Sequence, residues 1–447
     1  MKQQRIWNIL LFAGAMLVMA ALTAVMLPLL NKESGFSLIC IPITLVYAAG
    51  AVMLLKGSRA GKEGMEPLWV GAVLAVLALT VLSRVSLLPH QTDDFVEYLS
   101  VWLEQIRLLP GFSALVADIG NYNMPYFYML FALGKLLPQS ADLYVIKLVS
   151  VLFDYILAYF VMKLVMLRTT RRSLAIGSFI VALMVPSVIV NSAMWGQCDS
   201  IFTAFSLGAL YYGLRGKSRL SWAFFAIALS VKLQSVFLLP MLLVLLFTKR
   251  IRLKDVWVFP VVFVALLVPA MIAGRGFIDC ITIYWRQANS YSQLSMLAPS
   301  VFAWLPEGTR SNIPVTAAGV FTAGTVALLF LMYLLRRRNQ LDNEGMIEAA
   351  FLFTLIIPFF LPLMHERYFY AADAMAAVYL FWRPKRWYLS GLVCLSSFLC
   401  HTAYLFDKVT VPIWLLAFCI LAVICLVLRD FLLRIESRKA IRSSFLS

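Results

Sequence analysis

Uninterrupted apolar segments recur along the chain, for example at 6–30 and 411–428. They leave too little polar surface for a water-soluble fold. Of the 447 residues, 62% are apolar and 13% are charged, whereas soluble domains have about 45–50% and 25%. Only helices and closed barrels span a bilayer, because every backbone polar group there must be satisfied internally. Barrel strands alternate apolar and polar residues, and these segments do not. The sequence therefore predicts an all-α polytopic membrane protein.

Lysine and arginine concentrate in the short connectors between the apolar segments. The chain has 38 Lys+Arg and 22 Asp+Glu, a net charge of +16, which by itself would also suit nucleic acid. Basic clusters beside membrane spans instead mark cytoplasmic loops, so we expect no nucleic-acid partner and place both termini in the cytoplasm. The clusters are 56–62, 163–172, 215–219, 249–254, 336–338, 383–386 and 429–442.

Threading the chain from a cytoplasmic start at Lys2 and Arg5 predicts about 14 transmembrane helices. They are expected at 6–30, 37–55, 68–89, 144–166, 173–192, 199–214, 220–231, 235–248, 255–273, 314–335, 347–364, 368–382, 387–406 and 411–428. Two long extracytoplasmic loops, at about 90–143 and 274–313, are expected to contain amphipathic helices. We divide the chain into a two-helix extension (1–66), a transmembrane core (67–382) and C-terminal helices with a basic cytoplasmic tail (383–447).

Several predicted helices are too short to cross the bilayer, which requires about 20 residues. They are 199–214, the pair 220–231 and 235–248, and the pair 349–364 and 368–382. Their outer turns should lie below the membrane surface, where non-helical backbone is tolerated only around a cavity. We therefore expect one polar recess, open to the outer side. The turns contribute Trp195, Gln197, Asp199, Lys232, Gln234, His365, Glu366 and Arg367.

Two cations stand out among these residues. Lys232 interrupts an apolar stretch, and Arg367 follows His365 and Glu366. A cation within the membrane is costly and suggests a function, and a guanidinium beside an ammonium group suits a phosphate or diphosphate. Structural alternatives stay open. Lys232 can reach the membrane interface or be neutralised by Glu366, and Glu366 with Arg367 can form an ion pair that caps a helix.

The first outer loop carries carboxylates at Asp93, Asp94 and Asp118. A carboxylate on the aqueous side is suited to general-base catalysis on an acceptor hydroxyl. The alternatives are solvated loop acids, or a helix N-cap formed by Thr92 or Asp93. Aromatic and amide side chains can stack on a sugar and hydrogen-bond to it, although aromatic residues are also common at membrane interfaces.

Lys147 and Asp154 lie seven residues apart on one face of the predicted helix 144–166. That spacing corresponds to about 10.5 Å, which is too far for a direct bond. Each is therefore expected to pair with another helix and to have a structural role.

These motifs, in this order and on one expected side of the membrane, resemble the GT-C superfamily of membrane glycosyltransferases. Within it, the chain is most similar to bacterial relatives of the GPI-anchor second mannosyltransferase. The resembling blocks are 94–102, 121–126, Lys147 with Asp154, 195–200, 232–234, 298–299 and 364–369. The resemblance implies transfer of a hexose, such as mannose, from a polyprenyl-phosphate donor, with inversion, on the outer side of the cell membrane. The first two spans have no counterpart in it.

The resemblance also implies residue roles. Asp94 is expected to be the catalytic general base, with Asp93 as the alternative. Lys232 and Arg367 are expected to bind the donor phosphate, with His365 as a hydrogen-bond donor. The residues expected to bind substrate are Glu366, Trp195, Gln197, Asp199, Gln234, Tyr122, Asn123 and Asp118. None of these residues requires a cofactor, and a divalent cation held by Asp94, Asp118 and Asp199 stays open.

The sequence leaves the acceptor hydroxyl open among a cell-wall polymer, a lipid and a protein. Two other functions also stay open. A polytopic transporter or lipid-linked sugar flippase would equally have many spans and a polar recess, although transporters usually bind substrate near the midplane between repeats. A polymer ligase would keep the outer recess and use a diphosphate-linked donor.

Overall fold

The computed structural model describes residues 47–48, 50–52, 54, 67–288, 292–306 and 308–444. The predicted spans 6–30 and 37–55 therefore lie outside the described residues, apart from a few helical positions after residue 46. The chain forms two compact units. The first holds the described residues up to Gly120, Tyr126–Ala204 and Ala273–Arg275, and the second holds Asn121–Pro125, Phe205–Ile272 and Gly276–Ser447. The predicted division of the chain into an extension, a core and C-terminal helices, with boundaries at residues 66 and 382, stays a prediction.

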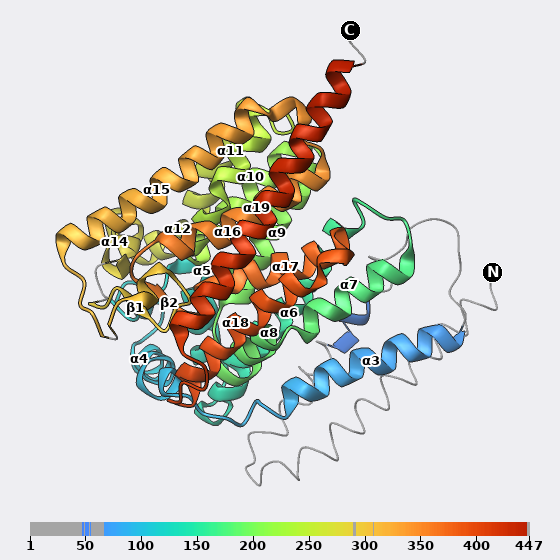
Figure 1. Ribbon diagram of the computed structural model, residues 1–447. Coiled ribbons are helices and arrows are strands. Elements are labelled where there is room, and N and C mark those ends of the chain that lie inside the picture. Colours follow the sequence, from blue (N-terminus) through green and yellow to red (C-terminus); the bar gives the residue numbers. More distant parts are fainter. Residues whose placement is uncertain are drawn as a thin grey trace. The chain divides into compact units, whose positions relative to one another are not determined.

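In the first unit, the helices gather around α6 (Figure 1). They are α3 (Pro67–Val85), a π-helical segment (Phe95–Leu99), α4 (Ser100–Leu108), most of α5 (Met124–Leu136), α6 (Asp142–Val165), α7 (Arg172–Met184), α8 (Pro186–Ile189) and a second π-helical segment (Val190–Trp195). α6 packs against α7 and the second π-helical segment. Most of α6 is buried, including the charged residues Lys147 and Asp154.

The span expected at 173–192 is broken in the structure. α7 ends at Met184 and Pro186 begins the next helix, with an angle of 57° between the two parts. Proline removes a backbone donor and disfavours the helical conformation of the residue before it. Val185 is accordingly extended, at φ −60° and ψ 120°. Pro186, a signal visible in the sequence, therefore bends the predicted span 173–192 into two helical parts, and the crossing of the pair as one span stays a prediction.

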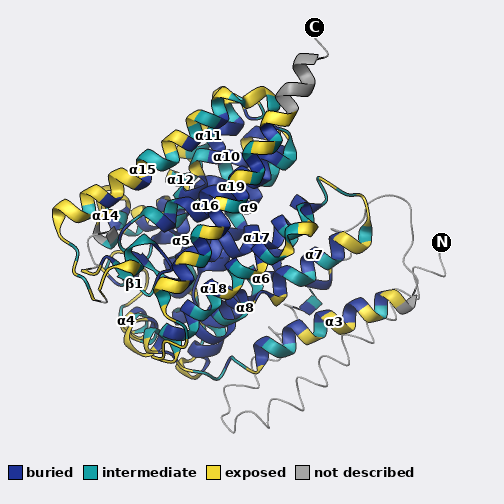
Figure 2. Cartoon of the chain, viewed as in Figure 1, coloured by how far each residue is buried: buried dark blue, intermediate teal, exposed yellow. Residues whose placement is uncertain are grey.

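In the second unit, α16 (Asn343–Phe360) is the central helix. Helix α9 (Asp199–Leu214) belongs to the first unit up to Ala204 and to the second from Phe205. The other helices of the second unit are α10 (Ser218–Val231), α11 (Leu239–Phe247), α12 (Val258–Ala273), α13 (Phe277–Ile281), α14 (Ile283–Ala288), α15 (Ile313–Arg336), α17 (Tyr370–Trp382), α18 (Trp387–Leu405) and α19 (Ile413–Ser444). α16 packs against α15, α17 and α19. Figure 2 shows α16 largely buried and α15 widely exposed, as expected for a lipid-facing helix.

The described residues contain six helices long and apolar enough to cross a membrane, or seven if the bent pair at Pro186 is one span. The multi-pass helical class is therefore confirmed, and the count of 14 stays a prediction. α10 and α17 are short as expected, at 14 and 13 residues. α16 is not, because it begins at Asn343, where the Asp342 side chain accepts a hydrogen bond from the Gly345 amide and caps the helix. It reaches 18 residues, so the expectation of a short helix there was wrong.

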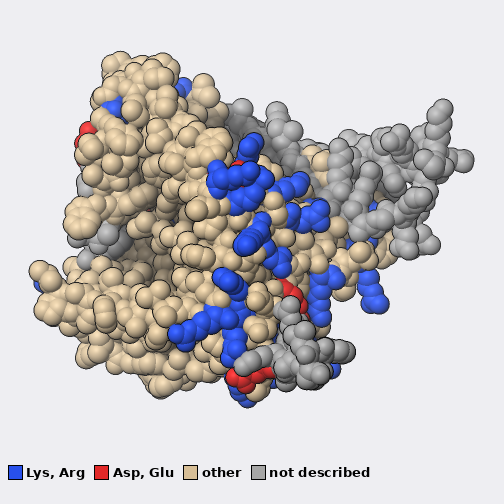
Figure 3. All heavy atoms as spheres, turned by 90° about the horizontal axis from the view of Figure 1, so that it is seen from above, with Lys and Arg blue, Asp and Glu red and all other residues tan. Residues whose placement is uncertain are grey.

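Polar contacts join several basic connectors of the second unit at one end of its helices. Arg250 donates to Asn343 at 2.6 Å, and Arg383 pairs with Glu348 at 2.7 Å. Arg434 of α19 also pairs with Glu348. The sequence assigned the connectors containing these arginines to the cytoplasm, and this assignment stays a prediction. Figure 3 shows how lysine and arginine side chains cluster on one face, with few acidic ones.

The second unit also contains two strands of two residues each, which the all-α prediction did not include. β1 (Ser295–Met296) from the second long loop pairs in parallel with β2 (Met364–His365). The Leu363 amide extends this contact by donating to the Leu294 carbonyl at 2.8 Å. The pairing fixes the loop directly beside the turn that carries His365, Glu366 and Arg367.

Candidate active site

Asp94 stands at the start of the first π-helical segment and is held by two side chains from a distant part of the first unit. Its Oδ2 accepts hydrogen bonds from Trp195 Nε1 and Gln197 Nε2, both at 2.8 Å. Trp195 is fully buried and Gln197 nearly so, whereas Asp94 is half-buried. The carboxylate is therefore oriented from the protein side while part of it stays accessible.

The turn between Trp195 and Gln197 depends on Gly196. This glycine has φ +80° and closes the second π-helical segment. A Cβ there would lie 3.3 Å from Lys147 Cγ, which adds a close contact to a conformation that favours glycine. The tight, left-handed turn allows residues on either side of Gly196 to bind the same oxygen of Asp94.

The other acids of the first unit have different surroundings. Asp93 is exposed, so the half-buried and hydrogen-bonded Asp94 is the better candidate for a base. The helix begins at Asp93, and the buried Thr92 Oγ1 before it has no hydrogen-bond partner among the described residues, which does not support capping by Thr92. Asp118 is exposed and pairs with Arg275 at 3.4 Å. Asp199 is buried and accepts a hydrogen bond from Asn191 Nδ2 at 2.9 Å.

In the second unit, Lys232 lies between two aromatic rings. It follows the last residue of α10, in extended conformation, and is 4% exposed. Its Nζ is 5.9 Å from the ring centres of both Tyr122 and Tyr368. Aromatic faces attract a cation at this distance. They stabilise the ammonium group without neutralising its charge.

Arg367 and Glu366 occupy the turn between β2 and α17. Arg367 Nη1 lies 3.4 Å from Glu366 Oε1, and His365 Nδ1 lies 3.5 Å from Glu366 Oε2. Glu366 is fully buried and Arg367 is 8% exposed. The ion pair that the sequence left as an alternative is therefore present. Lys232 adds a second cation to this cluster, close enough to His365 to act on its pKa, as Arg367 does.

The pKa values of this turn follow from burial and neighbouring charge. Burial lowers the pKa of His365 from its usual 6.5, and Arg367 and Lys232 lower it further against the opposing effect of Glu366. The imidazole is therefore neutral at pH 7 and can donate a hydrogen bond. Burial raises the pKa of Glu366, but His365, Arg367 and His401 outweigh it, so the pKa of Glu366 lies below its usual value.

The other predicted site residues of the second unit include Asn123 and Gln234. Asn123 Nδ2 donates to the Tyr284 hydroxyl at 3.0 Å, and that hydroxyl donates to the Leu229 carbonyl near Lys232. Gln234 is half-buried, and its Oε1 accepts no hydrogen bond from the described residues. The structure thus groups Tyr122, Asn123, Lys232, Gln234 and the 365–367 turn.

The predicted site residues therefore form two groups. Asp94, Trp195 and Gln197 are together in the first unit, while Asp118 and Asp199 bind other partners. Within the described residues, no three His, Cys, Asp or Glu come together as a metal site, so Asp94, Asp118 and Asp199 do not form the triad that the sequence left open. The shared recess stays a prediction, because its residues divide between the two units.

The structure also places three residues that the sequence analysis did not single out in contact with Asp154 or Lys232. Arg84 pairs with Asp154 at 2.9 Å, and its position inside an apolar run was an available signal. Ser192 donates to the same carboxylate at 2.6 Å, and Tyr368 contacts Lys232. Neither of the last two stands out from its neighbours in the sequence. Lys147 and Asp154 bind other segments rather than each other, as expected.

Comparison with known proteins gives one finding. The sequence model of glycosyltransferase family 87 matches residues 122–358, which is more than half of the chain. The matched segment includes Trp195, Gln197 and Lys232, and it ends before the 365–367 turn. No curated protein matches the chain.

Proposed function

Because the chain belongs to glycosyltransferase family 87, and is thus a multi-pass membrane glycosyltransferase, we propose that it takes its sugar from a polyprenyl-phosphate donor. The sugar passes to an acceptor hydroxyl on the extracytoplasmic side of the cell membrane, with inversion. The observation that carries this proposal is the buried cluster of Lys232 and Arg367. Family membership favours sugar transfer over the transporter or flippase alternative.

The cationic cluster suits a departing phosphate. A lipid phosphate gains negative charge as the bond to the sugar breaks, and fixed cations in a site that excludes water stabilise that charge strongly. Arg367 offers a planar guanidinium and Lys232 a compact ammonium group. The neutral His365 adds a hydrogen-bond donor. Glu366 holds Arg367 and His365 in place, and the Oε1 of Gln234 is an acceptor for a hydroxyl of the sugar.

Asp94 is the proposed general base. In a single displacement, the acceptor oxygen attacks the anomeric carbon as its proton moves to the base, and the bond to the donor phosphate breaks. The bonds from Trp195 and Gln197 to Oδ2 orient the carboxylate, and we assign the proton to Oδ1. The resemblance favours a hexose such as mannose. The acceptor is a hydroxyl of a cell-wall polymer, a lipid or a protein.

A donor panel tests this proposal. Purified protein is mixed with polyprenyl-phosphate sugars labelled in the sugar, with membrane extract as acceptor source, and the product is analysed for its anomeric configuration. We expect transfer from at least one such donor with inversion. Transfer only from a polyprenyl-diphosphate or nucleotide-linked donor would refute the donor assignment. Uptake into proteoliposomes without any transfer would refute the enzyme mechanism.

Changes in the cationic cluster should weaken use of the donor. We expect Arg367→Lys and Lys232→Met each to lower kcat/KM for the donor by about 10- to 100-fold, because one hydrogen bond to a charged group contributes about 1.5–3 kcal/mol. The acceptor KM should change by less than about twofold. Steady-state kinetics with each substrate varied separately provide the measurement.

Arg429→Lys is the matched control for Arg367→Lys, because Arg429 is exposed on α19 and pairs with Asp430. It should leave both substrates' kinetics unchanged. Donor kinetics that are equally unchanged in Arg367→Lys and Lys232→Met would remove the phosphate from this cluster.

A further inference from the structure

Two buried charges on α6 contact both chain segments that meet at Asp94. Lys147 and Asp154 are 1% and 0% exposed. We propose that they are positioning residues, which hold Asp94 and its two hydrogen-bond donors in the arrangement that the reaction needs. This inference rests on the proposed role of Asp94 as general base.

Lys147 fixes the segment that leads to Asp94. Its Nζ donates to the carbonyl oxygen of Leu88 at 2.9 Å and of Leu87 at 3.5 Å, and also to that of His90. These carbonyls lie in the turn that follows α3. One ammonium group thus ties the chain just before Asp94 to α6.

The same lysine also supports the other segment. Its Cγ lies 3.3 Å from the position that a Cβ on Gly196 would take, so the aliphatic part of Lys147 packs beneath the turn between Trp195 and Gln197. Lys147 therefore contacts the segment before Asp94, which carries the hydrogen-bond acceptor, and the turn at Gly196, which carries the two donors.

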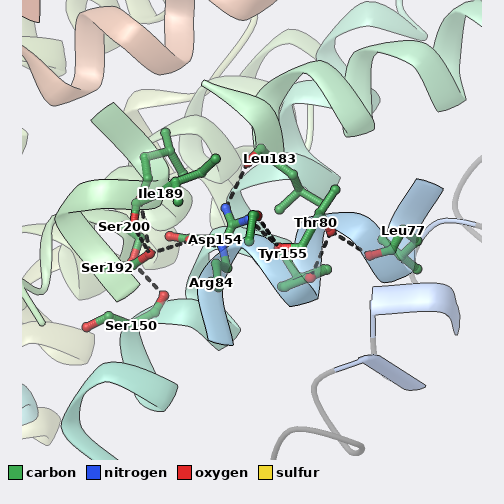
Figure 4. A network of polar contacts seen from close by, with 12 residues as sticks. Leu77, Thr80, Arg84, Ser150, Asp154, Tyr155, Leu183, Ile189, Ser192 and Ser200 are labelled. Carbon is green, nitrogen blue, oxygen red and sulfur yellow. Dashed lines mark hydrogen bonds and ion pairs between the residues drawn. The ribbon is translucent and has the colours of Figure 1, made fainter. Parts of the chain in front are cut away.

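Asp154, two turns further along α6, holds the helix that carries Trp195. Its Oδ2 accepts hydrogen bonds from Ser192 Oγ at 2.6 Å and from Arg84 Nε at 2.9 Å. Ser192 lies in the π-helical segment three residues before Trp195. Arg84 also donates to the Leu183 carbonyl at 2.9 Å, where α7 breaks. Figure 4 shows Arg84, Asp154, Ser192 and Leu183 in this network.

Both segments joined at Asp94 are π-helical, Phe95–Leu99 and Val190–Trp195. Such turns are rare and occur frequently at functional sites. Their backbone hydrogen bonds join residues five apart instead of four. A catalytic group misplaced by about 1 Å can lose 100-fold in rate. Asp154 contacts the second of these segments through Ser192, and Lys147 contacts carbonyls of the chain just before the first.

Ser192→Ala tests the Asp154 side, because it removes one hydrogen bond without leaving a charge unpaired. We expect kcat to fall by about 10- to 100-fold, with the KM of donor and acceptor within about twofold of the original. Ser178→Ala is the matched control. Ser178 is equally buried and bonds a carbonyl of its own helix, so its loss should leave kcat unchanged.

A spectroscopic readout separates positioning from general stability. The eleven tryptophans are labelled with 5-fluorotryptophan, and the ¹⁹F resonance of Trp195 is assigned by its loss in Trp195→Phe. Ser192→Ala and Lys147→Met should both shift this resonance, and Ser178→Ala should not. Because it records the surroundings of Trp195 without turnover, this measurement does not depend on the role of Asp94.

Failure of the inference and failure of the proposed function are thus distinguishable. An unmoved Trp195 resonance in Ser192→Ala and Lys147→Met would overturn the inference, even if their thermal stability or rate falls. Near-normal activity of Asp94→Asn would overturn the proposed base, whatever the resonance does. If Lys147→Met does not fold, Lys147→Gln, which keeps an amide donor, takes its place. If that variant does not fold either, Ser192→Ala decides the result alone.

Discussion

Asp94→Asn is expected to lower kcat by roughly 100- to 10,000-fold, the usual contribution of a positioned general base. The amide oxygen can still accept the hydrogen bonds from Trp195 and Gln197, which both reach one oxygen of the carboxylate. The protein should therefore fold normally and bind its donor. The amide cannot take the acceptor's proton. Initial rates of sugar transfer, together with donor binding by the same preparation, provide the measurement.

Asp93→Asn is the control for this prediction, since Asp93 is adjacent but exposed. Its rate should stay within about twofold of the original protein. The base would be reassigned to Asp93 if this variant alone lost activity. If both variants transferred sugar at a normal rate, neither carboxylate would be the base.

Asp154→Asn should destabilise the protein by about 3–5 kcal/mol, because it leaves the guanidinium of Arg84 buried without a counter-charge. Arg84 and Asp154 are both almost fully buried, at 1% and 0% exposure, and their atoms are 2.9 Å apart. A loss of this size should lower the midpoint of thermal unfolding in detergent by several degrees. The midpoint is measured by heating samples to a series of temperatures and determining the remaining folded protein by size-exclusion chromatography.

The double variant Arg84→Met/Asp154→Leu provides the matched comparison. Replacing a buried ion pair by apolar side chains of similar volume is often close to neutral, so this variant should recover most of the lost stability. Its kcat should stay low, because Ser192 loses its hydrogen bond to the Asp154 carboxylate. A double variant that is as unstable as Asp154→Asn would show that the unpaired charge is not the cause.

Residue type and order were enough to predict the membrane class, and they named the segments of the candidate site, which stays a prediction. Apolar runs predict helices in lipid, and Lys232 and the 365–367 turn stand out because polar residues interrupt those runs. The structure confirms that Lys232 lies between two helical segments and that 365–367 lies between α16 and α17. Arg250 and Arg383, from two of the basic connectors, both contact α16, and the cytoplasmic side of these connectors stays a prediction.

Three-dimensional packing decided which of these residues act on one another. The bonds from Trp195 and Gln197 to Asp94 join positions about a hundred residues apart, and no local pattern encodes such a distance. The pairing of Arg84 with Asp154 and the two π-helical segments likewise depend on how neighbouring helices pack. A side chain's partners follow from contacts between helices, whereas its tendency to be helical and apolar follows from its immediate neighbours in the chain.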